Sequence, residues 1–275
     1  MKFFYGFPIS VHCWGGLGSQ LYALAVVHDL KVKYPKRRVK LVLHTSGVTK
    51  RLSELNFIHD DNLEIKQVSD FQKLDNEHSS QMKLNRNRLK VPLKKILFFF
   101  NFIASANSNL EFNKVRLWTF STRGHYFNRE VTASFYSYLL KHIRLEKKLI
   151  KRHQFEMVIH YRIGDLLTLG TKSITPTSKI IEAIGQVKYS NDFNITVYSD
   201  SLEIAKEMLS SATPTYEFVV RDLPTIDVIR AGISSDYFIG TNSKISLWIV
   251  NLRRYIGDTK NNYLEGFDDK LYRTR

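Results

Sequence analysis

The feature that most constrains the fold is a regular alternation of strand-like and helix-like segments in the second half of the chain. Short β-branched runs are followed by segments with apolar residues at helical spacing. This alternation predicts a parallel sheet, because strands that run in the same direction need a crossover helix between them. The expected strands are 157–161, 195–198, 216–220 and 237–239, and the expected helices are 178–186, 202–209, 225–233 and 244–252.

The first half of the chain carries the same pattern less regularly. A strand is expected over 4–11, a glycine-rich turn over 14–18, and a helix over 20–34 that ends before a proline. Further strands are expected over 39–44 and 63–68. Elements in this order predict an open α/β sheet for the first half as well.

Two domains are expected from the length of the chain. Its 275 residues, 43% of them apolar, are enough for two hydrophobic cores. A helical pattern runs from Val131 to about Ile143, and the charged segment after it is the predicted hinge. The first domain is therefore predicted at 1–145 and the second at 146–275.

The chain is strongly basic, with 41 Lys and Arg against 26 Asp and Glu, a formal net charge of +15. Such a field attracts phosphates, nucleic acid and anionic lipid alike. The cations are spread over both halves without a nucleic-acid-binding signature, so we expect no nucleic-acid partner. The one cysteine, Cys13, fits a reducing compartment, and a cytoplasmic location is expected.

A glycine-rich loop, WGGLGSQ over 14–20, joins the first expected strand to the first expected helix. Glycines there let the backbone approach a ligand, and a helix N-terminus presents amides. The third glycine of a dinucleotide fingerprint and the lysine of a Walker loop are both missing. Gly16, Gly18 and Gln20 are candidate residues beside a bound ligand, with a simple tight turn as the alternative.

A second candidate site follows the strand at 157–161. His160 and Arg162 emerge on one face at its carboxyl end, where open α/β sheets bind ligands. An arginine placed there can bind a diphosphate through two nitrogens. The alternative is a structural salt bridge between Arg162 and Asp165.

Polar residues also follow the neighbouring strands. Ser199 and Asp200 end one strand and suit a ribose or a phosphate, although either residue could instead cap the next helix. Asn242 and Ser243 precede a helix whose N-terminus could hold a phosphate, again with capping as the alternative. Asp227 lies in a first helical turn, where it could bind guanine or simply complement the helix dipole.

These segments together resemble the bacterial α-1,2-fucosyltransferase family. GGLGSQLYALA looks like the GGLGNQ opening of that family, HYRIGD like its HxRxGD motif, and VYSDSLEIAKEML like its FSDD segment. TNSKISLW stands where the family has NSS and an aromatic stretch, and GHYFNRE resembles the aromatic segment before its second domain. The order and spacing agree over nearly the whole chain.

The resemblance implies a GT-B architecture, in which two Rossmann-like domains face each other across a cleft and the second binds the donor. It implies a GDP-fucose donor and a glycan acceptor, in bacterial surface polysaccharide or O-antigen synthesis. By similarity to this family and to the related α-1,6-fucosyltransferases, Arg162 would hold the diphosphate and Ser243 would touch a phosphate. His160 and Asp227 would contact guanine.

Transfer with inversion and without a metal ion is expected. The chain has no Asp-x-Asp pair, the usual metal-binding element of the other major glycosyltransferase architecture. Arg162 and the Asn242–Ser243 helix start can stabilise the leaving diphosphate without metal. The base that takes the acceptor proton is either Asp165 or a carboxylate or histidine of the first domain that faces the cleft, and we expect no cofactor. The alternative enzyme hypothesis is the same fold with another nucleotide sugar as donor.

The segment 83–106 is basic and then aromatic, and it contains no acidic residue. It suits a peripheral contact with an anionic membrane, which would bring the enzyme to lipid-linked acceptors on the inner face of the cytoplasmic membrane. The alternative is a buried helix with a solvated basic end. No targeting segment is visible at the N-terminus, and the longest apolar run, 96–100, is too short to span a bilayer.

Overall fold

A computed structural model shows two compact units that divide inside one helix. The first unit comprises Met1–Phe135 with Tyr272–Arg275, and the second comprises Tyr136–Leu271. The predicted hinge at 144–154 falls largely outside the described residues. The structure describes residues 8–45, 51–69, 90–105, 120–121, 124–127, 129–145, 155–169, 174–188, 192–213, 215–259 and 262–264.

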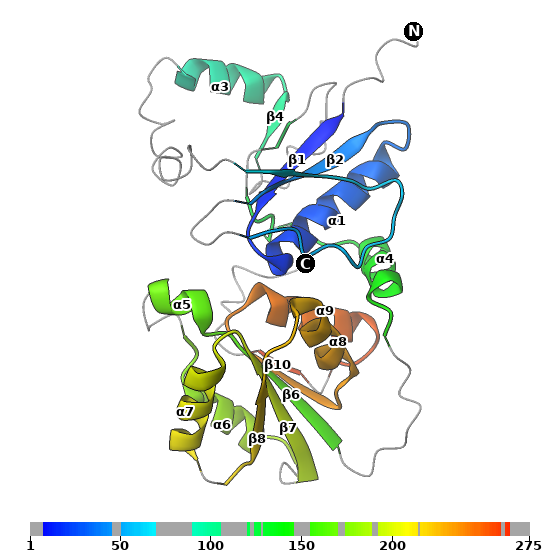
Figure 1. Ribbon diagram of the computed structural model, residues 1–275. Helices are drawn as coiled ribbons and strands as arrows, with labels where there is room; N and C mark the ends of the chain where they lie inside the picture. Colours follow the sequence, from blue (N-terminus) through cyan, green and yellow to red (C-terminus); the bar gives the residue numbers. More distant parts are fainter. Residues whose placement is uncertain are drawn as a thin grey trace. The chain divides into compact units, whose positions relative to one another are not determined.

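The first unit contains a five-stranded sheet in the order β3-β2-β1-β5-β4, with every pairing parallel. Figure 1 shows α1 lying along this sheet. The strands are β1 (Ile9–Trp14), β2 (Val39–His44), β3 (Glu64–Val68), β4 (Ile103–Ala104) and β5 (Phe120–Ser121), and the helices are α1 (Leu17–Lys33) and α3 (Lys90–Phe99). Helix α4 (Ala133–Ile143) contains the division between the units.

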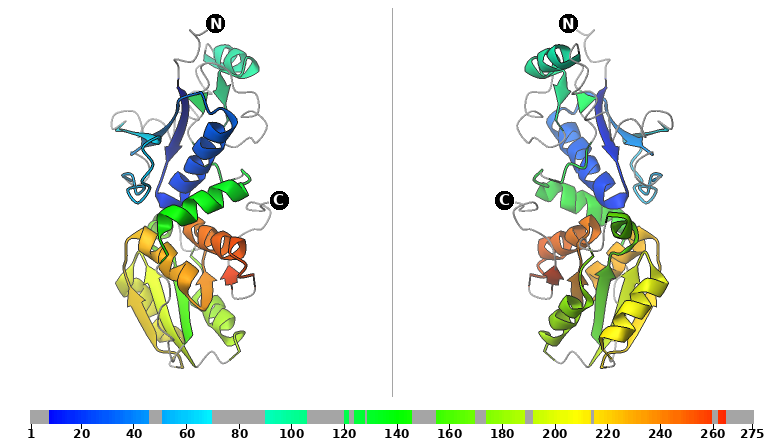
Figure 2. Two further views of the ribbon diagram at one scale, coloured as in Figure 1. Left: turned by 90° about the vertical axis from the view of Figure 1, so that its right-hand side faces the viewer. Right: turned by 90° about the vertical axis from the view of Figure 1, so that its left-hand side faces the viewer.

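Alternation along β1 gives the first sheet two different faces. Alternate positions from Ile9 to Cys13 are apolar and fully buried, and Cys13 Sγ lies 3.4 Å from the carbonyl oxygen of Ser19 in α1. Helix α1 therefore covers this face, as both views in Figure 2 also show. The opposite face carries His12 and Trp14, which are only partly buried.

The second unit contains a five-stranded parallel sheet in the order β10-β9-β6-β7-β8. Counted from its first strand, this is the order of a nucleotide-binding Rossmann fold, with the reversal point between β6 and β9. The strands are β6 (Phe155–Tyr161), β7 (Phe193–Ser199), β8 (Phe218–Arg221), β9 (Tyr237–Gly240) and β10 (Asn262–Leu264). The helices are α5 (Gly164–Leu169), α6 (Thr177–Gly185), α7 (Leu202–Ala212), α8 (Thr225–Ser234) and α9 (Lys244–Tyr255).

Helices cover both faces of the second sheet, as Figure 1 shows. Ile159 and Val197 pack with the buried residues of α6 and α7 in one apolar core. The neighbouring residue of β6, His160, points the other way and contacts Ser246 of α9. The predicted α/β class with parallel sheets is thus confirmed in both units.

Several predicted boundaries were wrong, for local reasons. Strand β1 continues to Trp14, because its ladder with β2 extends to the pair Trp14 and His44. Helix α1 begins at Leu17 rather than at residue 20, because the Glu54 carboxylate accepts a hydrogen bond from the Leu17 amide at 3.0 Å. Strand β8 begins at Phe218, not at residue 216. Residues 4–7 of the first predicted strand lie outside the described part of the chain.

Candidate nucleotide site at the end of the second sheet

The candidate site lies at the carboxyl ends of β6 and β9, where the strand order reverses. Thr241, which directly follows β9, is fully buried and joins the two strand ends. Its Oγ1 donates to the His160 carbonyl oxygen at 2.9 Å and accepts from the Arg162 amide at 2.9 Å. This fixes where the backbone of Arg162 leaves the sheet, at the point where open α/β sheets bind ligands.

The side chain of Arg162 is held by Asp200, which directly follows β7. Arg162 Nη1 lies 2.6 Å from Asp200 Oδ2. The other carboxylate oxygen, Oδ1, accepts from the amides of Ile163 and Gly164, both at 2.9 Å. Asp200 therefore ties the loop after β6 to the end of β7 and neutralises part of the arginine charge. Its carboxylate does not cap α7, whose N-cap residue is Ser201.

Gly164 allows the close approach of Asp200 to the loop backbone. A Cβ atom built on Gly164 would lie 2.7 Å from Asp200 Cγ, and closer still to Oδ2. Real Cβ atoms do not approach other atoms so closely, so any side chain here would displace the carboxylate. The glycine of HYRIGD is thus needed for packing and not only for a turn.

His160 is buried and electrically neutral. Its Nδ1 lies 2.8 Å from Ser246 Oγ on α9. Burial, and after it the Arg162 charge, lower the pKa of His160 to about 4, while Asp200 opposes the shift. At pH 7 the imidazole is therefore an uncharged hydrogen-bonding group beside a guanidinium.

The N-terminus of α9 starts directly after β9. Ser243 is its N-cap, and Ser243 Oγ accepts from the Ile245 amide at 3.1 Å. The capping alternative is thus confirmed for Ser243, and its hydroxyl hydrogen can still be donated to an anion. The Asn242 amide donates to Thr175 Oγ1 at 3.4 Å. The first turn of α9 contains no acidic residue, so its positive end is not neutralised from within the helix.

Asp227 and Ser199 have local partners. Asp227 lies in the first turn of α8 and pairs with Arg230 Nη1 at 2.7 Å. Burial raises the pKa of Tyr198 at the end of β7, and Asp227 raises it further, which places Asp227 near this sheet edge. Ser199 Oγ accepts from the Ser201 amide at 3.2 Å. Asp165 lies in α5, but its side chain is outside the described part.

In the first unit, the glycine loop is held by Gln20. Its side-chain Nε2 donates to the carbonyl oxygens of Gly15 and Leu52, both at 2.9 Å, and its Oε1 accepts from the Glu54 amide at 2.9 Å. Gly15 has a φ of 93°, which favours glycine, and Gly16 is the N-cap of α1. Gln20 is buried and makes three backbone contacts that hold the loop. Gly18 is buried in the first turn of α1.

A histidine cluster at the carboxyl end of the first sheet was missed from the sequence. Trp14 Nε1 donates to His125 Nε2 at 2.9 Å, and His125 Nδ1 lies 2.8 Å from Ser19 Oγ. Since the indole nitrogen only donates, His125 carries its proton on Nδ1. His12 Nδ1 lies 2.9 Å from His44 Nε2, so one of these two facing nitrogens donates a hydrogen bond to the other. The available signal was that β1 and β2 each place a histidine on the face opposite α1.

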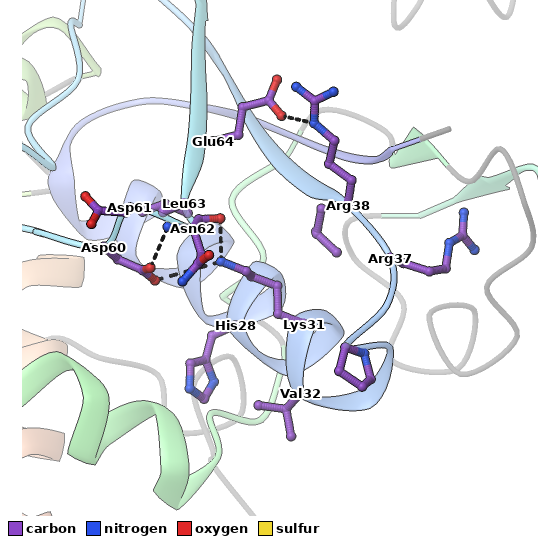
Figure 3. Close-up of a pocket in the computed structure, with 12 residues that line it drawn as sticks. His28, Lys31, Val32, Arg37, Arg38, Asp60, Asp61, Asn62, Leu63 and Glu64 are labelled. Atoms are coloured by element: carbon purple, nitrogen blue, oxygen red, sulfur yellow. Dashed lines mark hydrogen bonds and ion pairs between the residues drawn. The ribbon is translucent and has the colours of Figure 1, made fainter. Parts of the chain in front are cut away.

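A hollow of about 800 Å³ lies at the opposite, amino-terminal edge of the first sheet (Figure 3). Its charged groups neutralise one another, as Arg38 pairs with Glu64 at 2.7 Å and Lys31 lies 3.8 Å from Asp60. Lys31 also donates to the Asn62 carbonyl oxygen at 2.6 Å. We therefore do not place the candidate site there. Within the described ranges, no group of three or more His, Cys, Asp or Glu side chains is suited to hold a metal ion.

Comparisons with known proteins give weak likenesses only. No protein-family model matches the chain, and no curated protein matches it significantly. A crystal structure of NodZ α-1,6-fucosyltransferase soaked with GDP-fucose aligns at 12% identity over 90% of this chain and 91% of that one, with a TM-score of 0.45. A structure of selenomethionine fucosyltransferase NodZ from Bradyrhizobium aligns at 12% identity over 90% of each chain, with a TM-score of 0.38. At these scores neither likeness decides the fold or the function.

Proposed function

We propose that the chain is a GT-B glycosyltransferase that transfers L-fucose from GDP-fucose to a saccharide hydroxyl of a bacterial surface polysaccharide. The observation that carries the proposal is that Arg162 and the N-terminus of α9 follow the carboxyl ends of two neighbouring strands, β6 and β9, at the reversal point of the second sheet. A guanidinium and a helix N-terminus at one strand edge suit a diphosphate. The HYRIGD and GGLGSQ segments add the resemblance to fucosyltransferases.

The chemistry requires positive charge where the donor departs. The acceptor oxygen forms a bond to C1 of fucose while the bond from C1 to the diphosphate oxygen breaks, which inverts C1. Negative charge grows on the leaving GDP, and Arg162, the Ser243 hydroxyl and the α9 amides are fixed donors that would stabilise it. We therefore propose that turnover needs no divalent metal. Asp165 is the proposed acceptor of the proton released by the attacking hydroxyl.

Guanine recognition is proposed for His160 and Asp227. A neutral imidazole offers one donor and one acceptor, and its Nδ1 already faces Ser246, which leaves Nε2 for the ligand. The Asp227 carboxylate can accept two N–H groups of guanine if it exchanges its pairing with Arg230. Asn242, Ser199 and Asp200 complete the proposed donor site.

Calorimetric titration of GDP, UDP and GDP-fucose without divalent metal tests the donor site. GDP should bind more tightly than UDP, and Arg162→Ala should weaken binding by about tenfold or more, the effect of losing a charge-assisted pair of about 1.4 kcal/mol or more. The matched control is Arg254→Ala, an exposed arginine at the far end of α9. A preference for UDP would instead indicate another nucleotide sugar.

Two outcomes would reject the proposal. Binding of neither nucleotide would remove the donor site, and fucose transfer that disappears with EDTA would remove the metal-independent mechanism. Product analysis with GDP-fucose and candidate glycan acceptors then identifies the linkage.

A further inference from the structure

Helix α3 presents a large apolar patch to solvent. Ile96 and Phe99 lie one turn apart in α3, and Phe100 directly follows the helix and donates its amide to the Ile96 carbonyl oxygen at 3.0 Å, so the three residues follow i, i+3, i+4 spacing on one face. Their exposed fractions are 51%, 79% and 44%. Isolated exposed apolar residues are common, but three large neighbours on one face mark an interaction surface. We call these three residues the α3 patch.

The aromatic rings of this region contact each other. The rings of Phe99 and Phe100 meet edge to face with centroids 5.2 Å apart, and Phe100 lies 6.5 Å from Phe102. In Figure 2, α3 lies at the rim of the first unit, beyond the short strand β4. The patch is therefore a clustered apolar surface at an accessible edge of this unit.

The charged residues that neighbour the patch in the sequence are all positive. No acidic residue occurs between Ser79 and Leu110, and Lys95 next to Ile96 is exposed. The other cations of this stretch are Lys83, Arg86, Arg88, Lys90 and Lys94. A second copy of the chain would bring this concentration of positive charge against itself, which costs free energy. An anionic surface with an apolar interior complements both the cations and the phenyl rings.

We propose that the α3 patch docks the protein onto an anionic lipid bilayer, with Phe99 and Phe100 inserted at the headgroup boundary and the neighbouring lysines on the headgroups. A ten-residue helix is about 15 Å long, half the thickness of the hydrocarbon core. None of the described helices is long and apolar enough to cross a membrane. The contact is therefore peripheral, and it is independent of which nucleotide sugar the second unit binds.

Cosedimentation with vesicles tests this surface. The full chain should sediment with phosphatidylcholine vesicles that contain 30% phosphatidylglycerol and should bind pure phosphatidylcholine vesicles at least about tenfold more weakly, because each cation near an anionic surface contributes about 1 kcal/mol. Phe99→Ser with Phe100→Ser should reduce partitioning to the anionic vesicles about tenfold or more. Lys95→Glu, which leaves the phenyl rings in place, should also reduce partitioning to the anionic vesicles.

Phe155→Ser is the matched control, because Phe155 is a phenylalanine with 58% exposure in the second unit. It should leave vesicle binding unchanged. Thermal unfolding and GDP titration of the α3 variants should match wild type, which separates a docking defect from a folding or donor-site defect.

Equal binding by wild type and by the Phe99→Ser, Phe100→Ser variant would overturn the proposal. A second result would also overturn it: wild type fails to bind vesicles and forms a dimer in sedimentation velocity, and the Phe99→Ser, Phe100→Ser variant is monomeric. The α3 patch would then pair two copies of the chain.

Discussion

Asp200 holds Arg162 through one carboxylate oxygen, at 2.6 Å, while its other oxygen accepts from the backbone of the loop that carries the arginine. The carboxylate thus fixes both the side chain and the main chain of Arg162. Because Asp200 is already engaged in this way, we interpret it as the residue that positions Arg162 for the diphosphate. Losing it should disorder the arginine without removing its charge.

Asp200→Asn should weaken GDP binding about three- to tenfold, since the amide cannot accept both backbone hydrogen bonds and still pair with the guanidinium. Isothermal titration measures this. If Asp200 acts through Arg162, the double variant with Arg162→Ala should bind no more weakly than Arg162→Ala alone. Additive losses would mean that Asp200 contacts the nucleotide independently.

Gly164→Ala should destabilise the protein by about 1–3 kcal/mol, because the new methyl group would overlap the Asp200 carboxylate. It should also weaken GDP binding, since Arg162 loses its fixed partner. Denaturant unfolding gives the first quantity and calorimetry the second. Gly185→Ala is the matched control, because a Cβ at Gly185 in α6 meets nothing within 4 Å and should leave stability equal or slightly higher.

The buried His160 should make stability depend on pH. Its pKa falls from about 6.5 in the unfolded chain to about 4 in the native state, so between these values only the unfolded chain binds the proton. The free energy of unfolding therefore decreases as the pH falls through this window, by about 2 kcal/mol between pH 7 and pH 5. Above pH 6.5 the stability that depends on the neutral His160 is fully present.

Urea unfolding of wild type and His160→Asn at pH 7 and pH 5 measures this contribution. The variant should be less stable at pH 7 but should lose about 2 kcal/mol less on acidification. An identical pH dependence in wild type and His160→Asn would show that this imidazole is not buried in the neutral form.

The second sheet was predictable because its strands are short apolar runs, each bounded by turn residues, and its helices have clear apolar periodicity. The place of Arg162 at the carboxyl end of β6 followed from the expected parallel α/β pattern. The partner of Arg162 did not, because Asp200 lies far from it in sequence and adjacent only through the pairing of β6 with β7. The alternative that paired Arg162 with Asp165 used sequence proximity alone.

The first unit was less predictable for the same physical reason. Strands β4 and β5 have two residues each, too few for any periodic signal. The start of α1 depends on Glu54, and the cluster of Trp14 and His125 forms only when segments more than 100 positions apart meet. Local pattern carries no information on such contacts.

Gln20→Ala should destabilise the first unit by about 2–4 kcal/mol, because three partly buried backbone groups lose their hydrogen-bond partners. Thermal unfolding measures this loss. Gln67→Ala is the matched control, since exposed Gln67 accepts one hydrogen bond, from the Ser53 amide, and its removal should cost less than about 1 kcal/mol. Equal losses in the two variants would show that the Gln20 contacts do not hold the loop.

Substitution of Arg253 should lower the stability of the second unit strongly. Its side chain is fully buried in α9, and its guanidinium donates to the carbonyl oxygens of Gly232 and Ser235 at 2.7 and 2.8 Å and pairs with Asp258. Burial lowers the pKa of Arg253, while Asp258 opposes the shift. The group stays charged because its carboxylate and carbonyl partners replace water.

Arg253→Met should therefore cost about 3–5 kcal/mol, since it leaves the Asp258 carboxylate and several buried carbonyl oxygens without their donor. Arg253→Lys should recover only part of this, because an ammonium cannot reproduce the planar fork. The neighbouring Arg254 is exposed, so Arg254→Met should change stability by less than about 1 kcal/mol. Because α9 also supplies Ser243 at its other end, a loss of GDP affinity in Arg253→Lys at a temperature where the chain remains folded would show that this buried anchor sets the position of the proposed phosphate site.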